Sequence, residues 1–379
     1  MSDPFQALHA DLAALAGKAR LRTLQPRAGT DFSSNDYIGL AGHPRLRQAV
    51  AEALERGVPV GAGGSRLLRG NAPEHEALEH DAAQFFRCEA ALYLANGYGA
   101  NSALVSTLPQ RGDLVVYDRL IHASVHEGLR LTRADRAVAE HNDVGSFADV
   151  IAGWRAGGGK GRVWIVVESL YSMDGDCAPL AGLMALADAH DAVLLVDEAH
   201  ATGVFGPDGR GLAAELDGRA NVIALRTCGK ALGCEGALVC GPQVVKDMLV
   251  NRGRGFVFST APSPLMAVAV REALRVCADE PERRANLAAL VDYAAAVLAP
   301  LGIPASGSQI VPIIVGPDDK AMAFARAMQE AGFDIRGIRP PTVPTGTARL
   351  RLSLTLNAST QDVAAFGDAL SAIWSKRGI

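Results

Sequence analysis

Two short apolar runs, each followed by polar side chains, carry the residues best suited to catalysis. The run Val193–Val196 is followed directly by the carboxylate of Asp197, and the imidazole of His200 comes three positions later. A second run, Val222–Leu225, is followed by the amine of Lys230. Short apolar runs of this kind are typical of buried strands in a parallel sheet. Ligands of open α/β sheets bind where the carboxyl ends of adjacent strands diverge, so we expect these three groups to share one crevice.

An acid and an amine placed in this way suit pyridoxal 5′-phosphate (PLP). The amine of Lys230 can form a Schiff base with the aldehyde. The Asp197 carboxylate can keep the pyridine nitrogen protonated, so that the ring accepts carbanion electrons. The hydroxyl of Thr227 is close enough in sequence to bind the phosphate. The spacing of the acid and the amine fits one strand–helix–strand crossover. An ordinary buried ion pair at the end of a sheet is the alternative interpretation.

The bulk composition is that of an ordinary globular protein. The chain has 379 residues, of which 49% are hydrophobic and 21% are charged, and its formal net charge is −4. No basic or acidic block indicates a nucleic acid or a membrane surface as a partner. The chain begins without the pattern of a signal peptide, and no apolar run approaches the roughly 20 residues of a membrane span. We therefore predict a cytoplasmic protein.

The cysteines and histidines do not predict a metal site. The cysteines show neither a CxxC pair nor zinc-ligand spacing, which predicts free thiols in a reducing compartment. Cys228, close to Lys230, is explained by small apolar packing as well as by a nucleophilic role. His122 and His126 have the helical spacing of metal ligands but lack a third candidate. For His122, a ring-stacking or acid/base role is the alternative to a solvated helix start. The six cysteines are Cys88, Cys177, Cys228, Cys234, Cys240 and Cys277.

Strand-like segments alternate with segments of helical length along most of the chain. This alternation predicts a doubly wound, mostly parallel sheet. The alanine-rich stretch Met266–Leu298 predicts one long linking helix, and the segments after it predict a smaller α/β domain. The predicted strands are Ala91–Leu94, Leu114–Tyr117, Val163–Val167, Val193–Val196, Val222–Leu225 and Ala237–Cys240, with Ile310–Val315 in the smaller domain.

Three further segments predict local structure. Apolar positions between Pro4 and Arg22 have the spacing of a surface helix with one packed face. The segment His75–His80 has glutamate where a zinc-protease helix needs its second histidine, and is better explained as the polar face of a helix. The segment Asn96–Asn101 follows a strand and opens a helix whose first amides can hold a phosphate. Asn35 is either a polar turn residue or a substrate-facing side chain.

Seven segments of the chain resemble the α-oxoamine synthases, a PLP-dependent family with the aspartate-aminotransferase-like fold. The resemblance covers nearly the whole chain, and the segments occur in the family's order. It implies an α/β fold with a mostly parallel seven-stranded sheet in a large domain and a smaller C-terminal α/β domain. The implied parts are an N-terminal helix and substrate-facing segment (1–40), a large PLP-binding domain (41–270) and the C-terminal domain (271–379). The segments are FSSNDYIGL (32–40), GGSRLLRGN (63–71), DRLIHAS (118–124), ESLYSMDGD (168–176), VDEAHATG (196–203), TCGK (227–230) and RPPTVPTGTARLRLSL (339–354).

The resemblance also implies roles for residues around PLP. Lys230 would form the Schiff base, and its amine would then act as the general base. Asp197 would pair with the pyridine nitrogen, and His200 would hydrogen-bond the ring hydroxyl. His122 would stack on the other face of the ring and assist at the thioester carbonyl. The cofactor, mainly its phosphate, would be held by Gly97, Tyr98, Ser172 and Thr227, with Ser259 and Thr260 reaching the phosphate of a neighbouring subunit.

The activity that the resemblance implies is a PLP-dependent C-acyl transfer in a homodimer with shared active sites. The segment 339–354 is most similar to the branch that joins L-alanine to a pimeloyl group, carried by coenzyme A or acyl-carrier protein, in biotin biosynthesis. Glycine C-acetyltransferase, 5-aminolevulinate synthase and serine palmitoyltransferase are the alternatives within the family. A nicotinamide-dependent dehydrogenase would need an intact glycine fingerprint followed by an acid, and the region around Gly97 lacks this combination. A non-catalytic cofactor-binding protein is a further alternative.

The resemblance implies two groups of substrate-binding residues. Asn35 and Arg351 would hold the amino-acid carboxylate, and Arg339 and Thr342 would border the acyl-donor channel. A further arginine of the family contacts the substrate. It matches either Arg22 or Arg20, and the short segment before Phe32 leaves the choice between them open.

Overall fold

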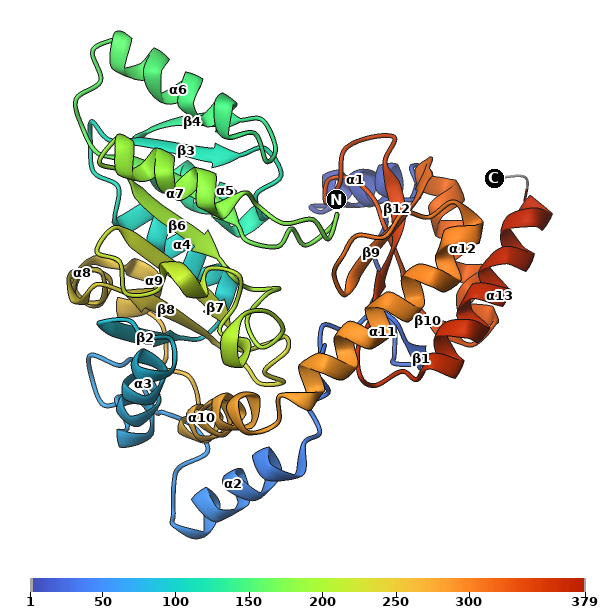
Figure 1. Ribbon diagram of the computed structural model, residues 1–379, viewed down its shortest axis with the longest axis horizontal. Helices are drawn as coiled ribbons and strands as arrows, with labels where there is room; N and C mark the ends of the chain where they lie inside the picture. Colours follow the sequence, from blue (N-terminus) through green and yellow to red (C-terminus); the bar gives the residue numbers. More distant parts are fainter. Residues whose placement is uncertain (1–2, 378–379) are drawn as a thin grey trace. The chain divides into compact units, whose positions relative to one another are not determined.

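The computed structural model describes residues 3–377, which form two compact units. The larger unit comprises residues 38–172 and 176–284. The smaller unit comprises the described residues before Ile38, the segment Met173–Gly175 and the chain from Ala285 onward. Figure 1 labels most of the elements of both units. The three-part division at residues 40 and 270 stays a prediction.

A seven-stranded sheet forms the centre of the larger unit, in the order β2-β8-β7-β6-β5-β3-β4 (Figure 1). Neighbouring strands are parallel except at β8, which runs antiparallel to both β2 and β7. The predicted doubly wound, mostly parallel sheet is therefore confirmed. The strands are β2 (Ala90–Leu94), β3 (Leu114–Asp118), β4 (Asp135–Ala139), β5 (Val163–Glu168), β6 (Val193–Asp197), β7 (Val222–Thr227) and β8 (Ala237–Gly241).

The edge strand β4 is the one strand of this sheet that the sequence pattern does not predict. Its sequence, DRAVA, contains no apolar run, and most of its residues are exposed or half-buried. Unlike the other edge strand, β2, which is apolar and buried, β4 carries charged and exposed residues, so it lacks the pattern of a buried strand.

Side chains of the central strands alternate between two apolar layers, as the two-residue period of a strand requires. Val166 and Leu195 lie in one layer with residues of α4, α5, α8 and α9. Ile165 and Leu194 lie in the other with residues of α6 and α7. Burial on both faces explains why these strands are unbroken apolar runs. The helices are α2 (Pro44–Glu55), α3 (Pro73–Phe85), α4 (Gly97–Thr107), α5 (Ala123–Leu131), α6 (Val144–Ala156), α7 (Leu180–Ala189), α8 (Gln243–Arg252), α9 (Arg254–Val257) and α10 (Pro264–Asp279), with 3-10 turns at Pro207–Gly209 and Ala214–Leu216.

The prediction of one long helix over Met266–Leu298 is wrong. The structure has two helices there, α10, which ends at Asp279, and α11 (Glu282–Leu298). Pro281 lies between them. A proline ring cannot continue the helix before it, but it is tolerated at a helix start.

The prediction that no apolar run approaches the length of a membrane span is wrong for the segment Glu282–Leu301. By length and composition alone it could cross a membrane, with a mean hydropathy of 1.2. Its buried residues, however, recur at helical spacing along one side, which is typical of a helix packed on the core of a globular unit. These residues are Leu287, Leu290, Ala294 and Leu298.

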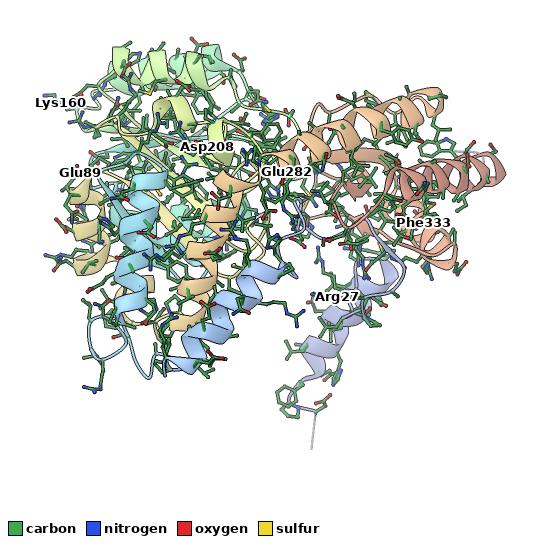
Figure 2. The ribbon with its side chains drawn as sticks, turned by 60° about the horizontal axis from the view of Figure 1, so that its bottom comes forward. Arg27, Glu89, Lys160, Asp208, Glu282 and Phe333 are labelled. Atoms are coloured by element: carbon green, nitrogen blue, oxygen red, sulfur yellow. The ribbon has the colours of Figure 1, made fainter. Side chains whose placement is uncertain are left out.

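The smaller unit contains a three-stranded antiparallel sheet, β11-β12-β9, and a short parallel pair, β1-β10. Phe32, Phe333 and Phe366 pack together, with ring centroids 4.9 to 6.0 Å apart. Figure 2 labels Phe333 among the side chains of this unit. The aromatic cluster joins the start of the chain to its end. The elements are α1 (Gln6–Gly17), β1 (Thr30–Asp31), β9 (Ile310–Gly316), α12 (Asp318–Glu330), β10 (Phe333–Asp334), β11 (Arg336–Ile338), β12 (Ala348–Ser353) and α13 (Thr360–Arg377), with a 3-10 turn at Ala299–Leu301.

The helix predicted near the N-terminus exists as α1, but the prediction that one face is packed is wrong within this chain. None of its residues is buried. Leu8 is 61% exposed and Leu12 is 49% exposed, although their spacing is that of a packed face. The apolar stripe of α1 is therefore left open to solvent or to another molecule.

Candidate active site

The register of three parallel strands gathers the chemical groups of the larger unit at one edge of its sheet. Glu168 at the end of β5 lies opposite Asp197 at the end of β6, and Asp197 lies opposite Leu225 of β7, two residues before Thr227. Glu168, Asp197 and Thr227 are buried. Lys230, in the bend after β7, is half-buried.

The amine of Lys230 lies close to the carboxyl end of these strands. Its positive charge acts on the pKa values of both Glu168 and His122, and the charge of Asp197 acts on the same two groups. His200 is buried in the turn that follows β6. The structure therefore brings together the acid, the amine and the imidazole of His122, and His200 follows Asp197 by three residues.

Asp197 is held by hydrogen bonds from two different elements. Its Oδ1 accepts from the backbone N–H of Ala199 at 2.9 Å, and its Oδ2 accepts from Nδ2 of Asn101, on α4, at 2.6 Å. Nδ2 of Asn101 also donates to Oγ of Ser124, on α5, at 3.0 Å. The Ser124 hydroxyl lies 2.8 Å from Nδ1 of His122. Continuous hydrogen bonding thus connects Asp197 to His122.

Asn101 and Ser124 are functional candidates that the sequence analysis missed. A usable signal was present, because Asn101 follows Gly97 by four residues and therefore lies on the same face of α4. Ser124 is at the end of the segment DRLIHAS, two residues after His122. The carbonyl oxygen of Asn101 is buried without a hydrogen-bond partner. Leaving such an atom unpaired costs about 1–3 kcal/mol, which indicates that the side chain is kept for its two donors.

Glu168 is an acid whose surroundings favour its neutral form. Burial, reinforced by the charge of Asp197, raises the pKa of Glu168 well above its ordinary value, although the charge of Lys230 acts in the opposite direction. Its Oε2 accepts from the backbone N–H of Ser172 at 3.2 Å, while its Oε1 is buried without a partner. Removal of a carboxyl group from water favours its uncharged form. Burial thus works against a second negative charge beside Asp197.

The start of α4 forms a cradle that fits a phosphate. Asn96 caps the helix by accepting from the N–H of Gly99 at 2.7 Å. A Cβ atom at Gly97 would lie 3.5 Å from Oγ1 of Thr227, so any larger residue would begin to fill the space between the helix start and that hydroxyl. Free N–H groups at a helix start attract anions. With Tyr98 next along the helix and the Asp197–Lys230 pair nearby, the residues present fit PLP.

The remaining predicted cofactor residues, Ser259 and Thr260, follow helix α9 of the larger unit. Both are exposed, and they line a small surface cavity with Arg66 and Tyr93. Among residues 3–377, no group of three or more histidine, cysteine or acidic side chains could hold a metal ion. The absence of a metal stays a prediction.

In the smaller unit, Arg351 and Asn35 are brought together as the sequence suggested. The guanidinium of Arg351 donates to Oδ1 of Asn35 at 3.1 Å, to the Tyr37 hydroxyl at 3.2 Å and to Oγ of Ser353 at 2.6 Å. The Tyr37 hydroxyl in turn donates to Oδ1 of Asn35 at 2.9 Å. Arg351 is only 7% exposed. These neutral oxygens fix a planar cationic fork of the kind that binds carboxylates.

A second arginine cluster of the smaller unit distinguishes Arg22 from Arg20. Arg20 pairs with Asp318 at 2.6 Å, whereas Nη2 of Arg22 lies 3.4 Å from Oγ1 of Thr342. Loss of hydration lowers the pKa of Arg339, and the nearby charge of Arg22 acts in the same direction. One group therefore contains Arg22, Arg339 and Thr342. Arg20 pairs with the acidic side chain of Asp318 instead.

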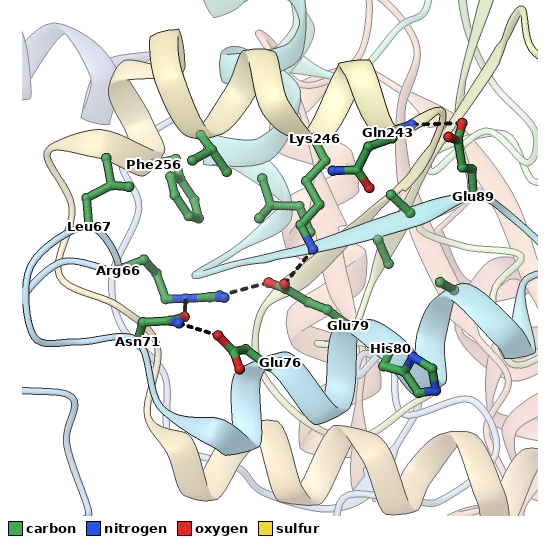
Figure 3. A pocket seen from close by; sticks show the side chains of 15 residues that line it. Arg66, Leu67, Asn71, Glu76, Glu79, His80, Glu89, Gln243, Lys246 and Phe256 are labelled. Carbon is green, nitrogen blue, oxygen red and sulfur yellow. Dashed lines mark hydrogen bonds and ion pairs between the residues drawn. The ribbon is translucent and has the colours of Figure 1, made fainter.

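A separate cavity of the larger unit, of about 490 Å³, corrects the prediction for His75–His80 (Figure 3). The segment lies on helix α3, but His75 and Glu79 are buried, while His80 is exposed. Figure 3 shows Glu79 between Arg66 and Lys246, at 2.8 and 2.9 Å. Glu79 can be buried because two cations offset its charge. The ion pairs of Glu79 thus join residues that line this cavity to one another. The residues of the cradle at the start of α4 do not line it.

His141 forms a charged cluster beside the segment that carries His122. Its Nδ1 lies 2.9 Å from Oδ1 of Asp118, and its Nε2 lies 2.7 Å from Oδ2 of Asp176. Burial lowers the pKa of His141, but the hydrogen bonds and charges of the two carboxylates raise it overall, to about 10. Asp118 also accepts from the N–H of Leu120 at 2.8 Å, which fixes the turn before His122.

The His141 cluster should make stability fall as the solution becomes alkaline. The pKa is higher in the folded protein than the value of about 6.5 for a free imidazole, so the stabilisation is complete below that pH and is lost as the pH rises toward 10. We expect the difference in free energy of unfolding between the wild type and His141→Asn to shrink over this range. Denaturant titrations followed by fluorescence of Trp154 and Trp164 measure it. The exposed control His80→Asn should show no such trend, and a constant difference for His141→Asn would contradict the assignment.

Comparison with known proteins places the chain in one family. Residues 27–367 match the model of the family Aminotransferase class I and II. The chain is 42% identical over 381 residues to the 8-amino-7-oxononanoate synthase of Geobacter sulfurreducens, over 99% of this chain and 96% of that protein.

Two solved structures have the same fold. The chain is similar to a serine palmitoyltransferase variant from S. paucimobilis solved with a PLP–myriocin aldimine, with a TM-score of 0.88, 25% identity, and coverage of 99% of this chain and 98% of that one. It is also similar to the 8-amino-7-oxononanoate synthase of Francisella tularensis, with a TM-score of 0.78, 25% identity, and coverage of 93% and 99%. The predicted aminotransferase-like fold is confirmed, and the chain belongs to the aminotransferase class I and II family.

Proposed function

We propose that the chain is an 8-amino-7-oxononanoate synthase. It condenses L-alanine with a pimeloyl thioester and releases CO2, the free thiol and 8-amino-7-oxononanoate, a step of biotin biosynthesis. The observation that carries this proposal is the 42% identity to an enzyme of that activity along nearly the whole chain. The buried acid and the amine at the ends of β6 and β7 supply the chemistry that this reaction needs.

PLP is the cofactor, and when bound it withdraws electrons from the Cα carbon of the amino acid. Lys230 holds its aldehyde carbon in the resting enzyme. The Asp197 carboxylate, fixed by Asn101, keeps the proton on the ring nitrogen, and His200 donates to the ring hydroxyl. The phosphate is held by the amides at Gly97 and Tyr98, at the start of α4, and by the hydroxyls of Ser172 and Thr227.

The side chains around the cofactor move and hold protons. The amine of Lys230, when not bound to the cofactor, would remove the Cα proton of L-alanine as a general base. Nδ1 of His122 is turned toward Ser124, so its Nε2 is left to donate to the thioester carbonyl oxygen. A donor at that position stabilises the negative charge that develops when the carbonyl is attacked. Loss of hydration lowers the pKa of His122, which keeps it a neutral donor.

We assign the substrate groups to the two arginine clusters of the smaller unit. Arg351 binds the carboxylate of L-alanine with Asn35, because a guanidinium fork pairs with both carboxylate oxygens as a lysine cannot. Arg22, Arg339 and Thr342 border the acyl donor, which is carried by coenzyme A or by acyl-carrier protein. The close approach of the two guanidinium groups favours an anionic part of the donor there.

We also propose that the enzyme is a cytoplasmic homodimer with shared active sites. Ser259 and Thr260 are exposed on the larger unit and are free to reach the phosphate of a second subunit. The exposed apolar side chains of α1 support a surface that a partner covers, because contiguous apolar patches mark interaction sites.

A substrate panel tests the proposed reaction. L-Alanine, glycine and L-serine are each combined with pimeloyl-, acetyl-, succinyl- and palmitoyl-coenzyme A and with pimeloyl-acyl-carrier protein, and thiol release is followed. We expect the highest kcat/KM for L-alanine with a pimeloyl donor. Lys230→Ala should abolish turnover because the base is lost, whereas Lys246→Ala, a lysine of the same unit that pairs with Glu79, should retain it. Fastest release with glycine and an acetyl group would instead identify a glycine C-acetyltransferase.

The two neighbouring acids should respond differently to neutral substitutions. Asp197→Asn should lower kcat by about three orders of magnitude or more, because an amide does not stabilise a protonated ring nitrogen as a carboxylate does. Glu168→Gln should change kcat by less than about tenfold, because burial raises the pKa of Glu168 and an amide resembles its neutral form. Steady-state kinetics with thermal melts of both variants measure this contrast. A greater loss in Glu168→Gln than in Asp197→Asn would reverse the assignment of the two acids.

A further inference from the structure

The hydrogen bonds between Asp197 and His122 have a determined direction. Nδ2 of Asn101 carries two hydrogens, which it directs to Oδ2 of Asp197 at 2.6 Å and to Oγ of Ser124 at 3.0 Å. Exchange of the amide nitrogen and oxygen of Asn101 would aim a carbonyl oxygen at the Asp197 carboxylate, which excludes that orientation. Ser124 therefore receives an N–H and keeps its own proton to donate.

The only acceptor for that proton in this set of bonds is Nδ1 of His122, at 2.8 Å. The same nitrogen also accepts from the backbone N–H of Ser124 at 3.3 Å. A ring nitrogen that accepts two hydrogen bonds carries no proton, so the proton of the neutral imidazole is at Nε2. The arrangement thus selects one of the two tautomers of His122.

We propose that Asn101 and Ser124 are positioning residues that hold Asp197 and His122 in register for the reaction. Asn101 orients the Asp197 carboxylate, and the same amide sets the Ser124 hydroxyl that fixes His122 with its proton at Nε2. One set of hydrogen bonds then contains both Asp197, which pairs with the ring nitrogen, and His122, which donates to the substrate carbonyl. The inference deepens the proposed function, because only that function assigns His122 to the carbonyl.

The burial of these side chains supports a positioning role over simple packing. Asn101, in the second turn of α4, is 1% exposed, and Ser124, in the first turn of α5, is fully buried. The carbonyl oxygen of Asn101 is buried without a hydrogen-bond partner, which lowers the stability of the fold. An apolar side chain of similar size would avoid this cost. The amide is therefore retained for the two bonds that it donates, both of which lead toward the site.

The test combines the tautomer of His122 with steady-state kinetics in the PLP-loaded enzyme. Magic-angle-spinning 15N spectra of protein with labelled histidine report which ring nitrogen carries the proton, and His122→Asn identifies the resonances. The wild type should show the Nε2–H form alone. Asn101→Ala and Ser124→Ala should each perturb the Nδ1 resonance and admit the second tautomer. Their kcat values should fall by about 10–100-fold, with KM for both substrates changed by less than about twofold.

Ser102→Ala, the next residue on α4 and outside this set of bonds, is the matched control and should change neither quantity. If Asn101→Ala does not fold, as judged by thermal melting, Ser124→Ala decides the matter because it leaves the Asn101–Asp197 bond in place. An unchanged His122 spectrum and kcat in the folded variants would overturn the proposal. If the wild type has the expected tautomer but no substrate pair releases thiol, the proposed function fails while this inference survives.

Discussion

A carboxylate can be buried at the end of a strand only if hydrogen-bond donors replace the water that it loses, and Asp197 depends on this condition. Its donors come from its own turn, at Ala199, and from α4, at Asn101. The start of α4 also forms the proposed phosphate cradle, so one helix sets both ends of the proposed cofactor site. The distance between acid and cradle is therefore fixed by the packing of α4 on the sheet.

A second buried network stabilises the same strand ends from the opposite side. Successive side chains of a strand alternate in direction, so Glu198 and Arg226 point away from their neighbours Asp197 and Thr227. Arg226 is fully buried, pairs with Glu198 at 3.3 Å and with Asp217 at 2.5 Å, and lies 4.2 Å from the centre of the Phe86 ring. Loss of one partner from such a buried pair typically costs about 3–5 kcal/mol. The network ties β6 to β7 where Asp197 and Thr227 must be held.

The parts predictable from sequence are those in which local pattern and tertiary environment agree. The central strands, buried on both faces, are unbroken apolar runs, and the polar residues after them mark the edge where the site forms. The edge strand β4 has no such run. The end of one helix and the start of the next around Pro281 were not predicted, because the residues on both sides have a helical pattern. Glu79 looked solvated because its partners, Arg66 and Lys246, are distant in sequence. Asn101 was missed for the same reason, since its contacts with Asp197 and Ser124 exist only after α4 packs on the sheet and against α5.

The central claim is that Lys230 and Asp197 hold the same PLP molecule, and borohydride treatment of the PLP-loaded protein tests it most directly. The reduction fixes the cofactor to the amine that holds it, and peptide mass mapping locates that amine. The account predicts the cofactor mass on the peptide containing Lys230. Label on another lysine, such as Lys246, or a protein that binds PLP without forming any reducible bond, would contradict it.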